Sequence, residues 1–143
     1  MITAIRHTGI VVSDLDKCLD FWTKIMGFKI FKVAEEKGKH VDGVMGLKDV
    51  NVTTAKLKAP DGNLIELLKF NSHKSEKAWN GNPHSTGITH IALQVDNLDK
   101  VIKKLTKHNV KFPGPGQTGP DKYAKVVYAR GPEGLILELV EIL

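Results

Sequence analysis

Four side chains, His7, Glu66, His90 and Glu138, have the types and positions that could carry out chemistry in this chain. Two imidazoles and two carboxylates suit a borderline divalent ion such as Ni, Co, Zn, Mn or Fe(II). The two carboxylates would balance the charge of the ion. Four protein ligands on an octahedral ion leave two adjacent positions for water or for a substrate with two neighbouring oxygens, and a Lewis acid stabilises negative charge on such oxygens. We therefore predict a metal site that binds a small molecule with vicinal oxygens.

The four residues lie at matching points of an internal repeat. Residues 7–17, HTGIVVSDLDK, recur as residues 90–100, HIALQVDNLDK. Residues 59–67, APDGNLIEL, recur as residues 131–139, GPEGLILEL. The segment between the two halves is rich in Asn, Ser, His, Gly and Pro, which favour loops. One domain, 1–143, is thus expected to consist of a module 1–70, a linker 71–86 and a module 87–143.

Both modules show the same predicted order of elements, strand, helix and three strands. In the first module the apolar periodicity and the caps predict a strand at 5–12, a helix at 14–26 and strands at 28–34, 50–58 and 63–70. In the second they predict a strand at 88–95, a helix from Asn97 and strands near 110–112, at 123–130 and at 135–142. This order predicts an α+β fold of two βαβββ modules, forming a cupped, mainly antiparallel sheet with the helices on its outer face.

Strand alternation indicates which face carries the four side chains. In the strand 88–95, Ile91, Leu93 and Val95 point to one face, so His90 points to the other. In the closing strand, Leu135, Leu137 and Leu139 suit the face under the helix and leave Glu138 on the open one. The repeat assigns the same orientations to His7 and Glu66. A carboxylate within such apolar strands is costly unless it is paired or binds a cation.

Composition excludes several other functions. The chain has 143 residues, 41% of them hydrophobic and 26% charged, which is typical of one globular domain. The net charge of +5 is spread evenly, and only two of the basic residues, Arg6 and Arg130, are arginines, so we expect no nucleic-acid partner. Neither a membrane span nor a secretion signal is evident, and the lone Cys18 fits a reducing compartment. The sequence thus predicts a soluble cytoplasmic protein.

The repeated motifs resemble the vicinal-oxygen-chelate superfamily, which includes glyoxalase I, methylmalonyl-CoA epimerase, extradiol dioxygenases and the fosfomycin- and bleomycin-resistance proteins. The resemblance rests on four segments, HTGIVVSDLDKCLDFWTKIMGF at 7–28, PDGNLIEL at 60–67, THIALQV at 89–95 and GPEGLILEL at 131–139. It implies a homodimer, and it puts His7, Glu66, His90 and Glu138 on the family's four metal-ligand positions. Whether they meet within one chain or across a dimer stays open.

The ligand set is most similar to that of bacterial glyoxalase I, so we expect a metal-dependent lyase or isomerase. It would abstract a proton next to a carbonyl or thiohemiacetal carbon, with Glu138 as the base and Glu66 as its counterpart. Use of glutathione stays open, because family enzymes that act on its adducts use arginines for the tripeptide carboxylates. The alternatives are an epimerase-like isomerase, an extradiol-type dioxygenase and a non-catalytic drug-sequestration protein. In the linker, Trp79 is a candidate interface anchor.

Overall fold

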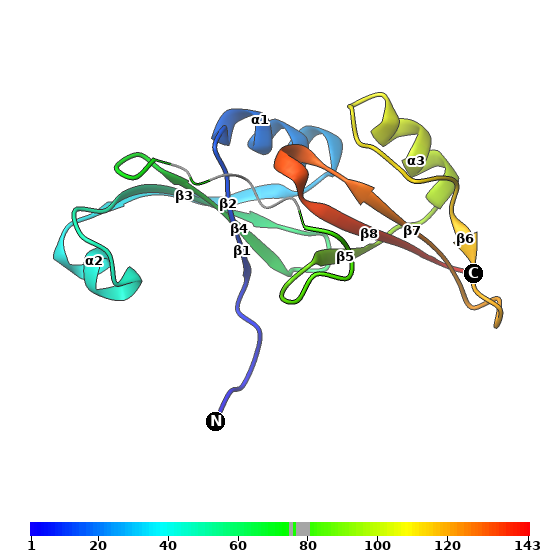
Figure 1. Ribbon diagram of the computed structural model, residues 1–143, viewed down its shortest axis with the longest axis horizontal. Helices are drawn as coiled ribbons and strands as arrows, with labels where there is room; N and C mark the ends of the chain where they lie inside the picture. The colour runs from blue at the N-terminus through cyan, green and yellow to red at the C-terminus, as the bar shows by residue number, and fades with distance from the viewer. Residues whose placement is uncertain (75, 77–80) are drawn as a thin grey trace. The chain divides into compact units, whose positions relative to one another are not determined.

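The computed structural model describes residues 1–74, 76 and 81–143. The chain divides into two units, Met1–Lys77 and Ala78–Leu143, and each contains a four-stranded mixed sheet with one long helical segment packed on it (Figure 1). The predicted α+β class and the two βαβββ modules are confirmed. Trp79 lies outside the described residues.

The first unit follows the predicted order of elements and contains one additional helix. Its elements are β1 (Thr8–Val11), α1 (Leu15–Asp20), the π-helical turn η1 (Phe21–Ile25), β2 (Lys29–Lys37), α2 (Lys39–Met45), β3 (Asn51–Lys58) and β4 (Leu64–Phe70). The strand order is β1-β4-β3-β2, in which β1 and β4 are parallel and the other pairs are antiparallel. The first strand of the module therefore lies beside its last strand.

The predicted helix at 14–26 is present, but its second half is a π-helix. Asp14 caps its start by accepting a hydrogen bond from the Lys17 amide at 3.0 Å. Along this helical segment Cys18, Phe21 and Trp22 are buried, whereas Leu19 is only partly so. The rings of Phe21 and Trp22 meet edge to face with centroids 5.6 Å apart. These side chains cover one face of the sheet, where Ala55, Leu57, Ile65 and Leu67 are also buried.

Helix α2 belongs to the first unit and was not predicted. It follows the extended β2 strand and lies at the far end of β2 and β3 in Figure 1. Val41 packs with Val50 and Val52 in a small buried cluster. The Asp42 carboxylate accepts a hydrogen bond from the Val50 amide at 2.8 Å, which joins the helix to the start of β3. Helix α2 is thus stabilised by packing and by this contact.

The second unit repeats the first without that helix. It consists of β5 (His90–Gln94), α3 (Leu98–Thr106), β6 (Gln117–Thr118), β7 (Ala124–Arg130), a 3-10 turn η2 (Pro132–Gly134) and β8 (Ile136–Ile142), in the strand order β5-β8-β7-β6. Helix α3 begins after Asn97, whose side chain accepts a hydrogen bond from the Lys100 amide at 2.9 Å. It packs against β8, with Leu98 and Leu105 buried.

The segment between α3 and β7 differs from the sequence-based expectation. The strand predicted near 110–112 is reduced to one antiparallel bridge between Lys111 and Arg130, and the short fourth strand β6 forms later in the chain. Gly116 explains part of the path, because a Cβ atom there would lie only 2.5 Å from Cδ2 of buried Leu98. The chain therefore passes close to the start of α3, and it does so where a side chain has no room.

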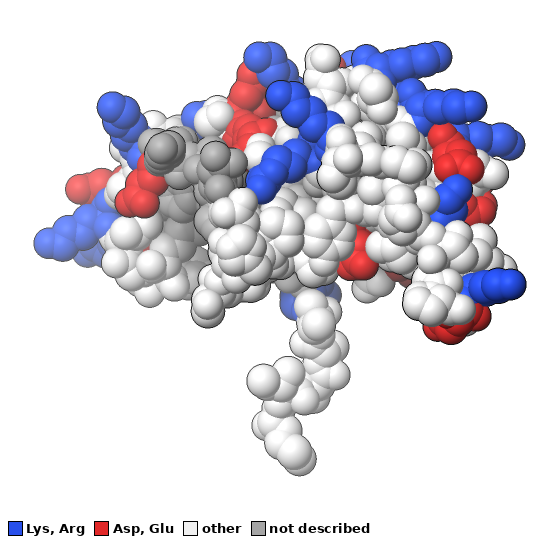
Figure 2. Space-filling view, turned by 45° about the vertical axis from the view of Figure 1, so that its right-hand side comes forward, with Lys and Arg blue, Asp and Glu red and all other residues white. Residues whose placement is uncertain are grey.

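None of the helices in the described ranges is long and apolar enough to cross a membrane. On the face drawn in Figure 2, lysine and arginine side chains are scattered among aspartate and glutamate side chains. The net charge of +5 is therefore not gathered into one stripe on this face.

Candidate functional site

In the first unit, parallel pairing of β1 and β4 brings His7 to Glu66. Gly9 lies opposite Glu66 in the register, so His7, two residues earlier, shares the face of that carboxylate. His7 Nε2 lies 2.9 Å from Glu66 Oε2. Lys56 is the residue opposite Glu66 on β3, and its Nζ lies 3.5 Å from Glu66 Oε1. Both carboxylate oxygens of this nearly buried residue therefore have a nitrogen partner.

The second unit builds the equivalent pair in the same way. Ala92 on β5 lies opposite Glu138 on β8, which places His90 on the face of that carboxylate. His90 Nε2 lies 3.1 Å from Glu138 Oε2. Tyr128 on β7 lies opposite Glu138, and its ring centroid is 5.0 Å from that of His90. The structure therefore joins the four predicted residues as two His–Glu pairs, one in each unit.

The alternation predicted for the strands explains why these side chains share a face. Leu137 and Leu139, on either side of Glu138, are completely buried under the helix side of the sheet, as are Ala55 and Leu57 around Lys56. Each glutamate therefore emerges on the opposite face. This face carries the imidazoles, because a step of two residues along a strand returns to the same side.

The two pairs differ in the second nitrogen of the imidazole. His90 Nδ1 lies 2.8 Å from Thr89 Oγ1, and if Nδ1 carries the proton, the Nε2 lone pair is free to bind a ligand. His7 Nδ1 is buried and has no hydrogen-bond partner among the described residues. Thr89 thus helps to orient one imidazole, whereas His7 depends on Glu66.

Lys56 and Tyr128 lie beside the two His–Glu pairs, and the sequence analysis did not single them out. Each of them lies opposite the glutamate of its own module. The signal was present in the repeat, because each stands four residues before the proline of the turn that leads to the last strand, Pro60 or Pro132. The two modules therefore differ in the third group beside the pair: an ammonium group in the first and a phenol in the second.

Both pairs fit a divalent ion by their donor types and distances. Two ligand atoms about 2.1 Å from one ion and at right angles to each other lie about 3.0 Å apart. The observed N···O distances of 2.9 and 3.1 Å agree with this value. Within either unit, the described residues hold no group of three or more His, Cys, Asp or Glu side chains suited to a metal ion. Each unit thus offers two ligands, half of the predicted set.

A protein-family model matches most of the chain. The model of the glyoxalase/bleomycin resistance protein/dioxygenase superfamily matches residues 4–139. The chain belongs to this superfamily. The superfamily includes enzymes that act on small substrates, and its members are typically metal-dependent.

Several relatives in this superfamily are similar over nearly the whole chain. The uncharacterized protein YwbC of Bacillus subtilis is 28% identical over 99% of both chains. A probable lactoylglutathione lyase of Vibrio parahaemolyticus is 27% identical over 96% of this chain and 89% of its own. The lactoylglutathione lyase of Schizosaccharomyces pombe is 30% identical over 95% of this chain but only 46% of its own length.

Solved structures show the same fold. A glyoxalase family protein from Bacillus cereus superposes with a TM-score of 0.89 at 25% identity, covering 100% of this chain and 96% of its own. The fosfomycin resistance protein FosX of Listeria monocytogenes, solved with Mn(II) and sulfate, has a TM-score of 0.66 at 15% identity and covers 100% of this chain and 94% of its own. At that identity, the likeness to FosX concerns the fold alone.

Proposed function

We propose that the protein is a metal-dependent lyase or isomerase that moves a proton next to a carbonyl or thiohemiacetal carbon of a small substrate with vicinal oxygens. The observation that carries this proposal is the repeated pair, in which a histidine Nε2 lies 2.9 or 3.1 Å from a glutamate Oε2. His7, Glu66, His90 and Glu138 would hold one Ni, Co, Zn, Mn or Fe(II) ion. When bound, the ion supplies Lewis-acid stabilisation of negative charge on the substrate oxygens.

Glu138 is the proposed base, because its carboxylate is less engaged than that of Glu66. Among the described contacts, Glu138 uses Oε2 for His90 and keeps Oε1 available, whereas Glu66 uses Oε2 for His7 and Oε1 for Lys56. The Glu138 side chain is 24% exposed and that of Glu66 only 11%, so Glu138 is also easier to reach. Glu138 Oε1 would take the proton from the substrate carbon and return it to the neighbouring position.

The lactoylglutathione lyases among the relatives, at 27–30% identity, support this class of reaction. The proposed assembly is a homodimer. It is supported by β2, which is an edge strand of its sheet and leaves Ile30, Phe31 and Val33 more than half exposed. Such apolar side chains on an edge strand favour contact with another chain.

The test begins with metal analysis of the purified protein, followed by proton exchange in deuterated water on a thiohemiacetal and on an acyl-CoA ester. We expect exchange on one of the two substrate classes, its loss on chelation, and its recovery when the ion is returned. Glu138→Gln should abolish exchange while most of the metal stays bound. Exchange at the wild-type rate in this variant would overturn the assignment of the base. Catechol oxidation with Fe(II) and oxygen, or drug binding that survives chelation, would overturn the proposed reaction.

A further inference from the structure

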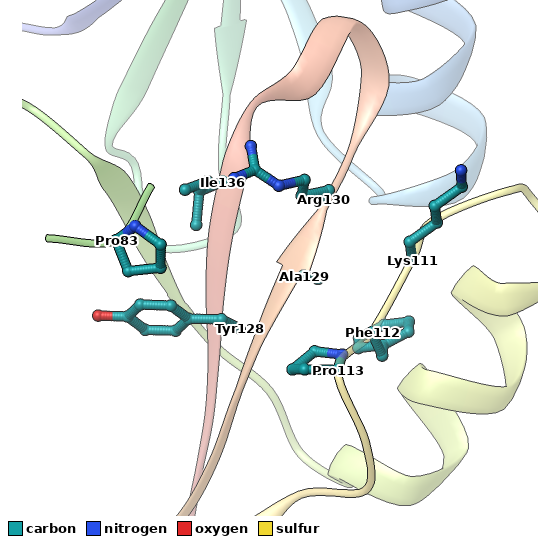
Figure 3. A pocket seen from close by; sticks show the side chains of 8 residues that line it. All are labelled: Pro83, Lys111, Phe112, Pro113, Tyr128, Ala129, Arg130 and Ile136. Atoms are coloured by element: carbon teal, nitrogen blue, oxygen red, sulfur yellow. The ribbon is translucent and has the colours of Figure 1, made fainter. Parts of the chain in front are cut away.

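A pocket of about 290 Å³ lies in the second unit beside the His90–Glu138 pair. Its lining residues are Pro83, Lys111, Phe112, Pro113, Tyr128, Ala129, Arg130 and Ile136. In Figure 3, Pro83 and Tyr128 lie on one side and Phe112 and Pro113 on the other, with Arg130 reaching across above Ile136. Most of the lining is therefore apolar, and its charged groups are both cationic.

The two cations are an arginine and a lysine without an acidic partner. In the described part of the chain, neither Lys111 nor Arg130 forms an ion pair; the Arg130 guanidinium instead donates to two backbone carbonyls, Gly81 O at 2.7 Å and Gly134 O at 3.2 Å. Carbonyl groups bring no net charge, so the positive charge of this half-buried group is not neutralised. A guanidinium has five N–H donors, so three remain for a ligand.

The two cations come from neighbouring segments of backbone, but only Arg130 reaches into the pocket (Figure 3). The backbones of Lys111 and Arg130 exchange hydrogen bonds at 3.1 and 2.8 Å, which makes them directly opposite neighbours. The Lys111 side chain is exposed and points away from the guanidinium (Figure 3). A carboxylate matches the planar fork of an arginine, so Arg130 is the group that would hold an anionic ligand in this pocket.

The pocket is connected to the proposed reaction centre through shared residues. Tyr128 lines the pocket, its ring lies tilted against that of His90, and it is opposite Glu138 in the sheet. Ile136 lines the pocket and lies opposite His90. A molecule in the pocket would therefore be held beside the imidazole and the carboxylate of this unit.

Hydrogen bonds within the unit support two walls of the pocket. The hydrogen bond from Arg130 to Gly81 O holds the segment that carries Pro83, and the Lys111–Arg130 bridge holds the segment that carries Phe112. A preformed pocket loses little free energy in ordering its side chains. Its volume is at the lower limit of small-molecule sites, which span about 300–1,000 Å³, so it suits a compact ligand.

We propose that this pocket binds the substrate as a compact anion, with an aromatic or aliphatic body among Tyr128, Phe112 and Ile136 and a carboxylate at Arg130. The inference names the substrate class of the proposed function and rests on it for the reaction. Binding itself needs neither turnover nor the ion. The pocket would therefore favour small apolar carboxylic acids over bulky tripeptide adducts.

Phenylacetate is the probe, and phenylacetamide is its neutral counterpart of the same shape. Both are titrated into the full-length protein, followed by amide chemical shifts in NMR, first as purified and again after chelation. We expect phenylacetate to shift the amides of Phe112 and Tyr128 and to bind at least tenfold more tightly than phenylacetamide. Binding should survive chelation, which excludes direct coordination of the carboxylate by an ion. Equal affinities for the two probes, or loss of phenylacetate binding on chelation, would overturn the proposal.

Substitutions of Arg130 test whether its positive charge causes the preference for phenylacetate over phenylacetamide. Arg130→Gln should remove the preference for phenylacetate, whereas Arg130→Lys, which keeps the positive charge, should retain part of it. Lys103→Gln removes one charge from the exposed side of α3 and serves as the matched control, with affinity unchanged. The comparison of phenylacetate with phenylacetamide is made on the wild-type protein. It therefore tests the role of the ligand's charge even if an Arg130 variant folds poorly. If phenylacetate binds but no proton exchange occurs on either substrate class, the proposed reaction is refuted, whereas the proposed ligand class of the pocket stands.

Discussion

Removal of one imidazole tests whether the two His–Glu pairs serve a single ion. A ligand present at about 100 times its dissociation constant stabilises the folded protein by about 2.7 kcal/mol. For a chain of this size, about 3 °C of melting temperature corresponds to each kcal/mol, so the expected rise is about 8 °C. If His7 and His90 bind the same ion, His7→Ala and His90→Ala should each lose most of this rise. The double variant should lose no more than either single variant.

The assay is thermal unfolding of each variant with and without Ni(II), Zn(II) or Mn(II), together with metal analysis. Each variant is compared with its own metal-free state, so the cost of the substitution itself cancels. His108→Ala removes an exposed histidine from the second unit and should keep the full rise. Two ions per chain, or losses in the single variants that add up in the double variant, would show two independent sites and refute the shared ion.

Three further predictions concern the fold and are measured by urea unfolding. Gly116→Ala places a Cβ atom 2.5 Å from a Leu98 methyl group and should lower the free energy of unfolding by about 1–3 kcal/mol. Gly114→Ala is the control, because nothing lies within 4 Å of its Cβ position, and it should lower that free energy far less. Equal losses in the two variants would contradict the close approach. Asn97→Ala removes the cap of α3 and should cost about 1 kcal/mol, which Asn97→Ser should largely restore; a neutral alanine variant would refute the cap. The backbone hydrogen bond that Asp14 accepts lowers the pKa of its carboxyl below the ordinary 3.8. Because the unfolded chain then binds more protons near that pH, the stabilisation by Asp14 is present above pH 3.8 and lost as pH falls through the lowered pKa. The difference between wild type and Asp14→Ala should therefore be larger at pH 7 than near pH 2, and a constant difference would refute the charge effect.

The order of strands and helices could be predicted because each of these elements carries its own local signal. Helix α3 has a cap at Asn97 and apolar residues at helical spacing, and β8 alternates around Glu138. Both are also supported by their copies in the repeat. Strand alternation and the repeat predicted the face on which the four side chains lie, whereas the pairing of each histidine with the glutamate of its own module depends on the parallel pairing of first and last strands, which was not predicted.

Features that depend on packing could not be predicted in this way. Helix α2 contains Gly43 and follows Gly38, which offers no side-chain cap, so its local sequence does not favour a helix. Burial of Val41 against β3 supplies the stabilisation instead. The strand expected near 110–112 had the right residue types, but only Lys111 finds a partner. Lys56 was missed because a lysine in an alternating strand is usually a solvent-exposed side chain.

The parallel pairing of first and last strands means that each His–Glu pair joins the two ends of its module. The imidazole comes from the beginning of the module and the carboxylate from its end, so the donor atoms meet only when the first and last strands pair. Such non-local strand pairing is slow compared with helix formation. A nascent chain ending before Leu64 would carry His7 without its partner. An ion that needs both donors of a pair would therefore bind only after the first and last strands of that module have paired.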